Sequence, residues 1–284
     1  MPPRENPTAR QARLGAELRK LRERAGRTAR EAAGLLSTDA ARISNTEAGR
    51  LGISEERIRK LATFYQCDDE PLITALCDIS AERRGTHWFD EYRGILAPGW
   101  LDIAELEFHS TALRSMQSTT MPGPFQTENY SRALFEGVRP HLPADEVEAR
   151  VAHRLKRREV FGHASSPTYE AILHEAALRM RWGGRKVARE QLEFLIEVSH
   201  MESVRVRVIP FTNESFIEVT QPVMYADGVV PQLDTVQIDS AFGGRFLDAE
   251  ADLKKYSALI NIAEDASLSE IESRQLIHHI AREM

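Results

Sequence analysis

Two side chains suited to recognising nucleic-acid bases, Arg42 and Asn45, lie three residues apart in a stretch whose pattern predicts a helix. A guanidinium can form two parallel hydrogen bonds with guanine, and an amide can do the same with adenine. The neighbouring Ala40 and Ala41 are small enough to contact thymine methyl groups. We therefore expect these four residues to contact base edges in the major groove of double-stranded DNA. The alternative is that Arg42 and Asn45 are solvated side chains on an exposed helix.

Polar and basic residues around this stretch are suited to contacting the DNA backbone. Such contacts position a protein on DNA without reading its sequence, and backbone amides at the start of a helix bind phosphate readily. The residues expected to contact phosphates are Arg27, Thr28, Arg30, Ser44 and Arg50.

Two short helices joined by a tight turn must hold these side chains in place. In the stretch 28–50 the turn precedes Asp39, which is positioned to cap the second helix through an amide two or three residues later. Ile43 and Thr46 point to one side of that helix, so one face can pack while the other stays exposed. This is the layout of a helix-turn-helix, in which the second helix enters the major groove.

Three further helices are predicted around this pair, in residues 10–25, 54–65 and 70–83. In the first of them, apolar residues recur at helical spacing from Leu14 to Leu21 and form one apolar face. The N-terminal domain is therefore expected to be mainly α-helical, with five helices.

Basic residues are concentrated in the N-terminal part of the chain. Residues 1–66 hold fourteen Lys and Arg against eight Asp and Glu, a balance of +6, whereas the remaining 218 residues have a balance of −12. A basic domain joined to an acidic one is typical of a polyanion-binding module with a separate second domain. The alternative is that these arginines are ordinary solvated side chains on exposed helices.

The length of 284 residues and the hydrophobic fraction of 42% predict two domains. We expect a disordered arm in residues 1–9, a helix-turn-helix domain in 10–84 and an α+β domain in 85–284.

No apolar run reaches the roughly eighteen residues that a membrane-spanning helix needs, and the N-terminus lacks the apolar stretch of a signal peptide. The sequence therefore predicts a cytoplasmic protein with no membrane partner.

The second domain mixes helical and strand-like patterns. Helical spacing of apolar residues runs through 87–95, 102–116, 127–137, 144–161, 175–181, 186–200, 247–263 and 268–282. Strand-like patterns run through 168–173, 204–209, 216–225 and 235–239. The presence of both kinds of element predicts the α+β class.

Motifs for enzyme chemistry are not found in the sequence. It has no HExxH, GxGxxG, P-loop or nucleophile-elbow pattern, and residues 183–186 are more typical of a helix end than of a phosphate-binding loop. Cys67 and Cys77 lack the second pair of ligands that a metal site needs, and are expected to be reduced thiols. We therefore predict no enzyme activity, no cofactor and no metal.

Two groups of residues in the second domain are candidates for a ligand or partner site, because aromatic and arginine side chains are enriched in binding interfaces. The candidates are Trp88, Phe89, Phe125, Gln126, Tyr130, Arg154 and Arg158. The alternatives are that the aromatic rings belong to the core and that the arginines are solvated.

The run Ile-Ser-Asn-Thr-Glu-Ala-Gly-Arg at 43–50 resembles the lambda-repressor-like (Xre/Cro-type) helix-turn-helix family, whose recognition helix typically ends in Ser-x-x-Glu-x-Gly. The resemblance covers about the first quarter of the chain. It implies that an arginine of the first helix pairs with the signature glutamate, which assigns a structural ion pair to Arg22 and Glu47. The family often has glutamine where this chain has Ala29 and Ala40.

The segments 88–92, 122–127, 175–179 and 208–211 are similar to the C-terminal domain of a large actinobacterial family of regulators with the same N-terminal helix-turn-helix. This resemblance implies a transcription regulator that acts beside a small partner protein encoded nearby. We therefore predict a sequence-specific DNA-binding regulator that forms a homodimer, with a second domain that senses a small-molecule effector or a partner protein. The alternative is an antitoxin-like protein whose main task is to bind the small partner protein.

Overall fold

The computed structural model describes residues 6–82, 85–161, 166–214, 221–240 and 243–284. Contacts between residues divide the chain into two compact units. Unit 1 comprises Met1–Glu91 with Val229–Leu233, and unit 2 comprises Tyr92–Gly228 with Asp234–Met284. Residues 83 and 84, next to the predicted domain boundary, and the first five residues of the predicted arm lie outside the described residues.

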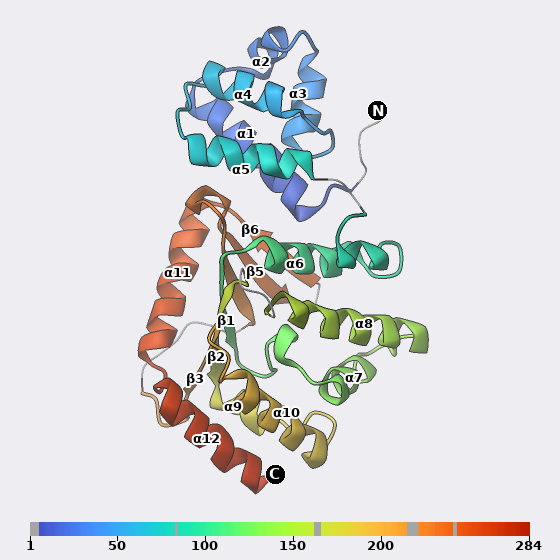
Figure 1. Cartoon of the computed structure of the whole chain (residues 1–284), viewed down its shortest axis with the longest axis vertical. Coiled ribbons are helices and arrows are strands. Elements are labelled where there is room, and N and C mark those ends of the chain that lie inside the picture. The colour runs from blue at the N-terminus through green and yellow to red at the C-terminus, as the bar shows by residue number, and fades with distance from the viewer. Residues whose placement is uncertain (1–5, 83–84, 162–165, 215–220, 241–242) are drawn as a thin grey trace. The chain divides into compact units, whose positions relative to one another are not determined.

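The described residues of unit 1 form five α-helices, as the sequence predicts (Figure 1). They are α1 (Ala9–Arg24), α2 (Ala29–Leu35), α3 (Ala40–Glu47), α4 (Glu55–Phe64) and α5 (Glu70–Ala81). α1 begins earlier than expected, because Thr8 and Gln11 cap each other's backbone amides through their side chains. The predicted disordered arm therefore does not extend to Thr8 and Ala9.

One apolar face of α1 packs into the core of unit 1. Leu14, Leu18 and Leu21, which show the predicted helical spacing, are each at most 8% exposed. They share one hydrophobic cluster with residues of the other four helices, including Ala32, Leu36, Ile43, Ile58, Leu61, Leu72 and Leu76. Burial of each large apolar side chain contributes about 1.5–3 kcal/mol, so the core holds α3 from its inner side.

Unit 2 is built on a mixed sheet of six strands in the described part of the chain (Figure 1). The strands are β1 (Ala112–Gln117), β2 (Thr168–His174), β3 (Val204–Ile209), β4 (Val223–Asp227), β5 (Thr235–Ser240) and β6 (Gly243–Leu247). Their order is β3-β2-β1-β4-β5-β6. β1, β2 and β3 are parallel, whereas the pairs β1–β4, β4–β5 and β5–β6 are antiparallel. This sheet, with its surrounding helices, confirms the predicted α+β class.

Helices cover both faces of the sheet, with α11 on one side and α6, α8 and α10 on the other in Figure 1. The α-helices of unit 2 are α6 (Pro98–His109), α7 (Glu128–Glu136), α8 (Ala144–Lys156), α9 (Glu175–Arg179), α10 (Arg185–Val198), α11 (Glu250–Asp265) and α12 (Glu270–Glu283). The chain also has 3-10 helices η1 (Trp88–Tyr92), η2 (Gly123–Phe125), η3 (Arg157–Phe161) and η4 (Pro231–Leu233). Leu113 of β1 shares one cluster with Leu192 of α10, and Met116 of β1 shares another with Ile260 of α11.

The position of β1 near the centre of the sheet corrects the sequence prediction. One helix is predicted over residues 102–116, but α6 ends at His109 and β1 begins at Ala112. The residues of β1 include good helix formers, so local propensity does not reveal the strand. Pairing with β2 on one side and β4 on the other stabilises it through contacts that are distant in sequence.

Two other strands also differ from the prediction. The predicted strand at 216–225 includes residues 216–220, which lie outside the described residues, and β4 begins at Val223. β6 is not predicted, because it contains Gly243 and Gly244 and glycine is disfavoured in strands. Its pairing with β5 makes it a strand.

A buried ion pair joins α6 to η3 inside unit 2. The Arg157 guanidinium donates to the Glu107 carboxylate through Nε at 2.7 Å and through Nη2 at 2.5 Å. Both side chains are at most 5% exposed. Gly123 of η2 makes room for the guanidinium, because a Cβ at that position would lie 2.8 Å from Arg157 Nη1. The pair therefore connects three segments of unit 2.

Replacing Arg157 with Met should lower the free energy of unfolding of unit 2 by about 3–5 kcal/mol, because the Glu107 carboxylate would stay buried without its partner. Urea denaturation of the full chain, followed by tryptophan fluorescence, measures this change. The control Arg189→Met removes the same charge from an exposed pair with Glu193 and should leave the transition unchanged. A double variant, Arg157→Met with Glu107→Leu, should recover most of the loss. If the double variant is as unstable as Arg157→Met alone, the unpaired Glu107 carboxylate is not the cause of the loss.

Candidate nucleic-acid interface

Side-chain caps fix the starts of α2 and α3. The Thr28 side chain caps α2 by accepting a hydrogen bond from the Glu31 amide. At the start of α3, the Asp39 carboxylate accepts a hydrogen bond from the Arg42 amide at 2.7 Å. The sequence allows Asp39 to cap the amide of either the second or the third residue after it. In the structure it caps that of the third, Arg42. Ser37, in the turn itself, has a φ of +50°.

α3 buries one part of its surface and exposes the rest. Ile43 and Thr46 are 3% and 8% exposed. The residues predicted to contact bases lie outside this buried stripe, three of them exposed and Asn45 half-buried: Ala40, Ala41, Arg42 and Asn45. The helix therefore brings the four residues together on its accessible side.

Hydrogen bonds within α3 hold two of the predicted contact residues. Asn45 Nδ2 donates to the Ala41 carbonyl at 2.9 Å, and Ser44 Oγ donates to the Ala40 carbonyl at 3.0 Å. The Asn45 amide must therefore rotate before it can bind adenine through two hydrogen bonds. Arg42 is exposed and forms no ion pair with any residue that the structure describes. Its guanidinium is the more available of the two side chains that are predicted to read bases.

The basic residues predicted to contact phosphates differ in how available they are. Arg30 and Arg50 are exposed, and within the described ranges neither forms an ion pair. The Arg27 guanidinium is less available, because it lies 3.7 Å from the Glu31 carboxylate and 4.6 Å from the centre of the Phe64 ring. Arg30 and Arg50 are therefore the better candidates for backbone contacts.

Thr28 is a poorer phosphate site than the sequence suggests. Its amide donates to the Glu31 carboxylate at 2.7 Å, and its hydroxyl donates to the same oxygen at 2.8 Å. The amide hydrogen bond is the main cause that lowers the pKa of Glu31. A carboxylate therefore already occupies the start of α2, and a phosphate has to displace it or bind beside it.

An interior ion pair fixes α3 against α1. Arg22 donates to both carboxylate oxygens of Glu47, through Nε at 2.6 Å and through Nη2 at 3.0 Å. Its Nη1 donates to the Arg27 carbonyl at 2.9 Å. The two side chains are only 12% and 9% exposed, and the hydrogen bond to Glu47 raises the pKa of Arg22. The structure thus has the contact that the resemblance assigns to Arg22 and Glu47.

Two glycines allow α1 to approach the end of α3. A Cβ at Gly15 would lie 2.4 Å from the Glu47 carbonyl oxygen, and one at Gly49 would lie 2.8 Å from the Ala12 Cα. Gly49 also has a φ of +72°, a conformation that favours glycine after a helix. The Ser-x-x-Glu-x-Gly pattern marks Gly49 in the sequence. Sequence reasoning missed Gly15, because no local pattern distinguishes a glycine that makes room for another helix.

In unit 2, three residues of the predicted ligand or partner site are interior, which corrects that prediction. Phe125, Gln126 and Tyr130 are at most 2% exposed. Gln126 Nε2 donates to the Met121 carbonyl at 2.8 Å, and the Tyr130 hydroxyl accepts a hydrogen bond from the Met121 amide at 3.3 Å. Burial raises the pKa of Tyr130. These side chains support the fold and do not form an exposed surface.

Arg154 and Arg158, from the same predicted site, meet at Gln126. Arg154 Nη1 donates to the Gln126 side-chain oxygen at 2.9 Å, and Arg158 Nη2 donates to the Gln126 carbonyl at 2.7 Å. Both arginines are partly exposed. This part of the predicted site therefore remains in contact with solvent.

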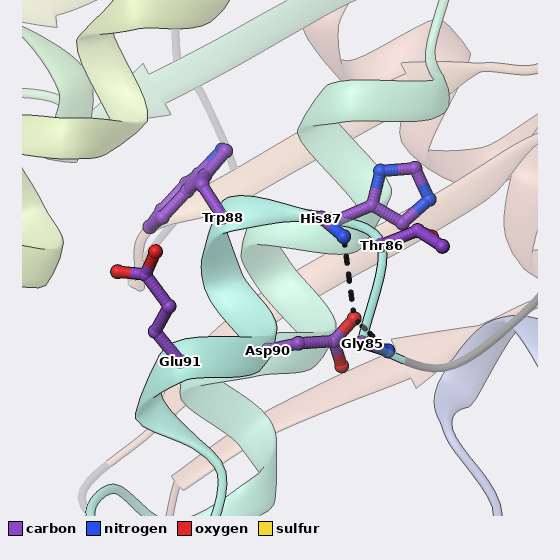
Figure 2. Close-up of a pocket in the computed structure, with 6 residues that line it drawn as sticks. All are labelled: Gly85, Thr86, His87, Trp88, Asp90 and Glu91. Carbon is purple, nitrogen blue, oxygen red and sulfur yellow. Dashed lines mark hydrogen bonds between the residues drawn. The ribbon is translucent and has the colours of Figure 1, made fainter.

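Trp88 and Phe89 belong to η1, beside an open pocket lined by Gly85, Thr86, His87, Trp88, Asp90 and Glu91 (Figure 2). The Asp90 carboxylate accepts hydrogen bonds from the Gly85 amide at 2.8 Å and from the His87 amide at 3.4 Å. Phe89 is only 3% exposed, and its ring stacks on His87 with centroids 5.1 Å apart. Asp90 therefore closes the turn, and Phe89 belongs to the core.

Comparisons with known proteins identify both parts of the chain. Residues 13–75 match the family described as a helix-turn-helix domain. Residues 100–279, more than half of the chain, match the family described as a domain of unknown function, DUF5753. The chain belongs to the DUF5753 family. No curated protein and no solved structure matches it.

The match over 13–75 confirms the predicted helix-turn-helix in this DUF5753 protein. A domain of this kind suggests a DNA-binding regulator.

None of the helices that the structure describes has the length and apolar composition to cross a membrane. Among the described side chains, no group of three or more His, Cys, Asp and Glu could hold a metal ion. Burial raises the pKa of the Cys77 thiol, which makes it less reactive.

In the DUF5753 protein, Glu47→Gln should lower the free energy of unfolding of unit 1 by about 3–5 kcal/mol, because the Arg22 guanidinium would stay in the interior without a carboxylate. Hydrogen exchange of unit 1 peptides at increasing urea concentration measures this change.

Glu23→Gln is the matched control, because Glu23 pairs with Arg19 where both side chains are more than half exposed. Its unfolding midpoint should stay at the wild-type value. Equal shifts in the two variants would show that the interior position of the Glu47 pair has no special effect.

Proposed function

We propose that this DUF5753 protein is a sequence-specific DNA-binding transcription regulator of the lambda-repressor-like type, in which α3 enters the major groove. The observation that carries the proposal is Arg42, an exposed guanidinium on α3 with no ion pair among the described residues. Its neighbours Ala40 and Ala41 are too small to shield it from a base edge. A guanidinium matches the two acceptors of guanine in the major groove.

The charge of the N-terminal part supports the same proposal. Residues 1–66 carry a balance of +6, and the exposed Arg30 and Arg50 lie on the two sides of α3 in the sequence. Arginines that neutralise phosphates release counterions from DNA, so the affinity should fall as the salt concentration rises.

We also propose that the protein binds DNA as a homodimer. α3 has eight residues, and a helix of that length extends only about 12 Å. One such helix contacts few base pairs. Two subunits with their recognition helices in successive major grooves, about 34 Å apart, would double the contacts and would favour a palindromic site.

The test begins with a genome-wide map of bound DNA, which supplies the site. Arg42→Ala should then weaken binding of the full chain to that site by about 5- to 150-fold, because one bidentate base contact is lost. Arg50→Ala should weaken binding to all sequences alike and reduce the salt dependence by about one counterion. Fluorescence anisotropy at several salt concentrations measures both effects. The control Arg189→Ala removes an exposed arginine of α10 and should change neither quantity.

If Arg42→Ala binds the site with wild-type affinity, Arg42 does not contribute to base recognition. Absence of DNA binding even at low salt, where phosphate contacts are strongest, would contradict the proposed regulator. The antitoxin-like role would then take its place, and co-purification with the product of the neighbouring gene would test it.

A further inference from the structure

Four arginines lie close together in the sequence of α8 and η3, and two of them have carboxylate partners. Arg150 donates to Glu146 at 2.5 Å. Arg157 has the buried pair with Glu107. The charges of these two arginines are therefore compensated inside unit 2.

Arg154 and Arg158 have no such compensation in the part of unit 2 that the structure describes. Arg154 Nη1 donates to the neutral side-chain oxygen of Gln126, and its Nε is buried without a hydrogen-bond partner among the described residues. Arg158 donates to the carbonyls of Pro124 at 3.2 Å and Gln126 at 2.7 Å. Two guanidinium groups thus meet at one residue, and every acceptor that they have is uncharged.

The surroundings of Arg154 disfavour its charge. Burial, together with the positive charges of Arg157 and Arg150, lowers its pKa to about 9. Glu107 and Asp239 act in the opposite direction, but neither forms an ion pair with Arg154 in the described structure. Holding a poorly compensated cation in the protein is unfavourable unless an anion joins it.

Aromatic rings hold both guanidinium groups in place. The Arg154 guanidinium carbon lies 5.4 Å from the centre of the Trp100 ring and 5.0 Å from that of Phe135. That of Arg158 lies 4.2 Å from the centre of the Phe194 ring. The side chains of Arg154 and Arg158 are half-buried, so each keeps some contact with solvent. Because these donors are already held in place, binding a ligand costs little of their side-chain conformational entropy.

We propose that Arg154 and Arg158 form a binding site for the phosphate or carboxylate group of a small molecule, with Arg154 as the principal donor. A planar guanidinium binds either group through two parallel hydrogen bonds. The site lies within unit 2 and does not depend on DNA binding. The proposal assigns the second domain an anionic ligand of small size.

Thermal unfolding of the full chain without DNA tests the proposal, with inorganic phosphate and malonate as probes and chloride at equal ionic strength as reference. At least one probe should raise the melting temperature of the wild type along a saturating curve, because a ligand of the folded state stabilises it. A response to phosphate alone or to malonate alone identifies which anionic group the site takes.

Three variants separate binding from structural support. Arg154→Met should lose the saturating response and, without probe, melt no lower than the wild type. Arg154→Lys keeps the positive charge but lacks the two parallel N–H donors of the guanidinium. It should need at least about tenfold more probe for half-saturation. The control Arg189→Met should respond as the wild type does.

Three results would overturn the proposal. The first is a wild type that responds to both probes only as it does to chloride. The second is an equal response in the wild type and Arg154→Met, which would be the general effect of excluded salts. The third is a lower melting temperature of Arg154→Met with an intact probe response, which would make Arg154 a structural residue.

Discussion

The two-pronged contact between Arg22 and Glu47 is the interaction on which the orientation of α3 and of its exposed surface depends. α3 has eight residues, which is too short for a helix to be stable alone, so its direction is set by what it packs against. Ile43 and Thr46 hold its buried side, Asp39 fixes its start, and the Arg22 fork fixes its end against α1. A buried ion pair adds little net stability. Its effect here is geometric, because both carboxylate oxygens of Glu47 are held in one orientation.

Unit 2 uses the charge of its arginines in two different ways. The Arg157 guanidinium is neutralised by Glu107 and fixes the segments around it. Arg154 and Arg158 rest against aromatic rings and neutral oxygens. The first arrangement explains a fold, whereas the second is what a site for an anion requires. A regulator with such a site would combine a DNA-reading helix in unit 1 with a ligand-sensing domain in unit 2.

Features that depend on neighbouring residues could be predicted from the sequence, and features that depend on distant ones could not. Helical spacing and caps such as Asp39 gave the five helices of unit 1 and the exposed side of α3, because these signals act within a few residues. β1 was predicted as helix, since its strand conformation comes from pairing with β2 and β4. The burial of Gln126 and the close approach at Gly15 likewise arise from packing between segments far apart in sequence. The capture of the Thr28 amide by Glu31 is local, and the spacing Thr-x-x-Glu could have revealed it.

The most direct test of this account is the affinity of Arg22→Met for the mapped DNA site, measured as a function of salt at a temperature where hydrogen exchange shows unit 1 to be folded. Arg22 is an interior residue that orients α3 and touches no phosphate in this account. The variant should therefore bind its site at least about tenfold more weakly, as expected when a bidentate base contact is misplaced, while the dependence of affinity on salt stays at the wild-type value. Unchanged affinity, or a salt dependence reduced by about one counterion as for a lost phosphate contact, would contradict it.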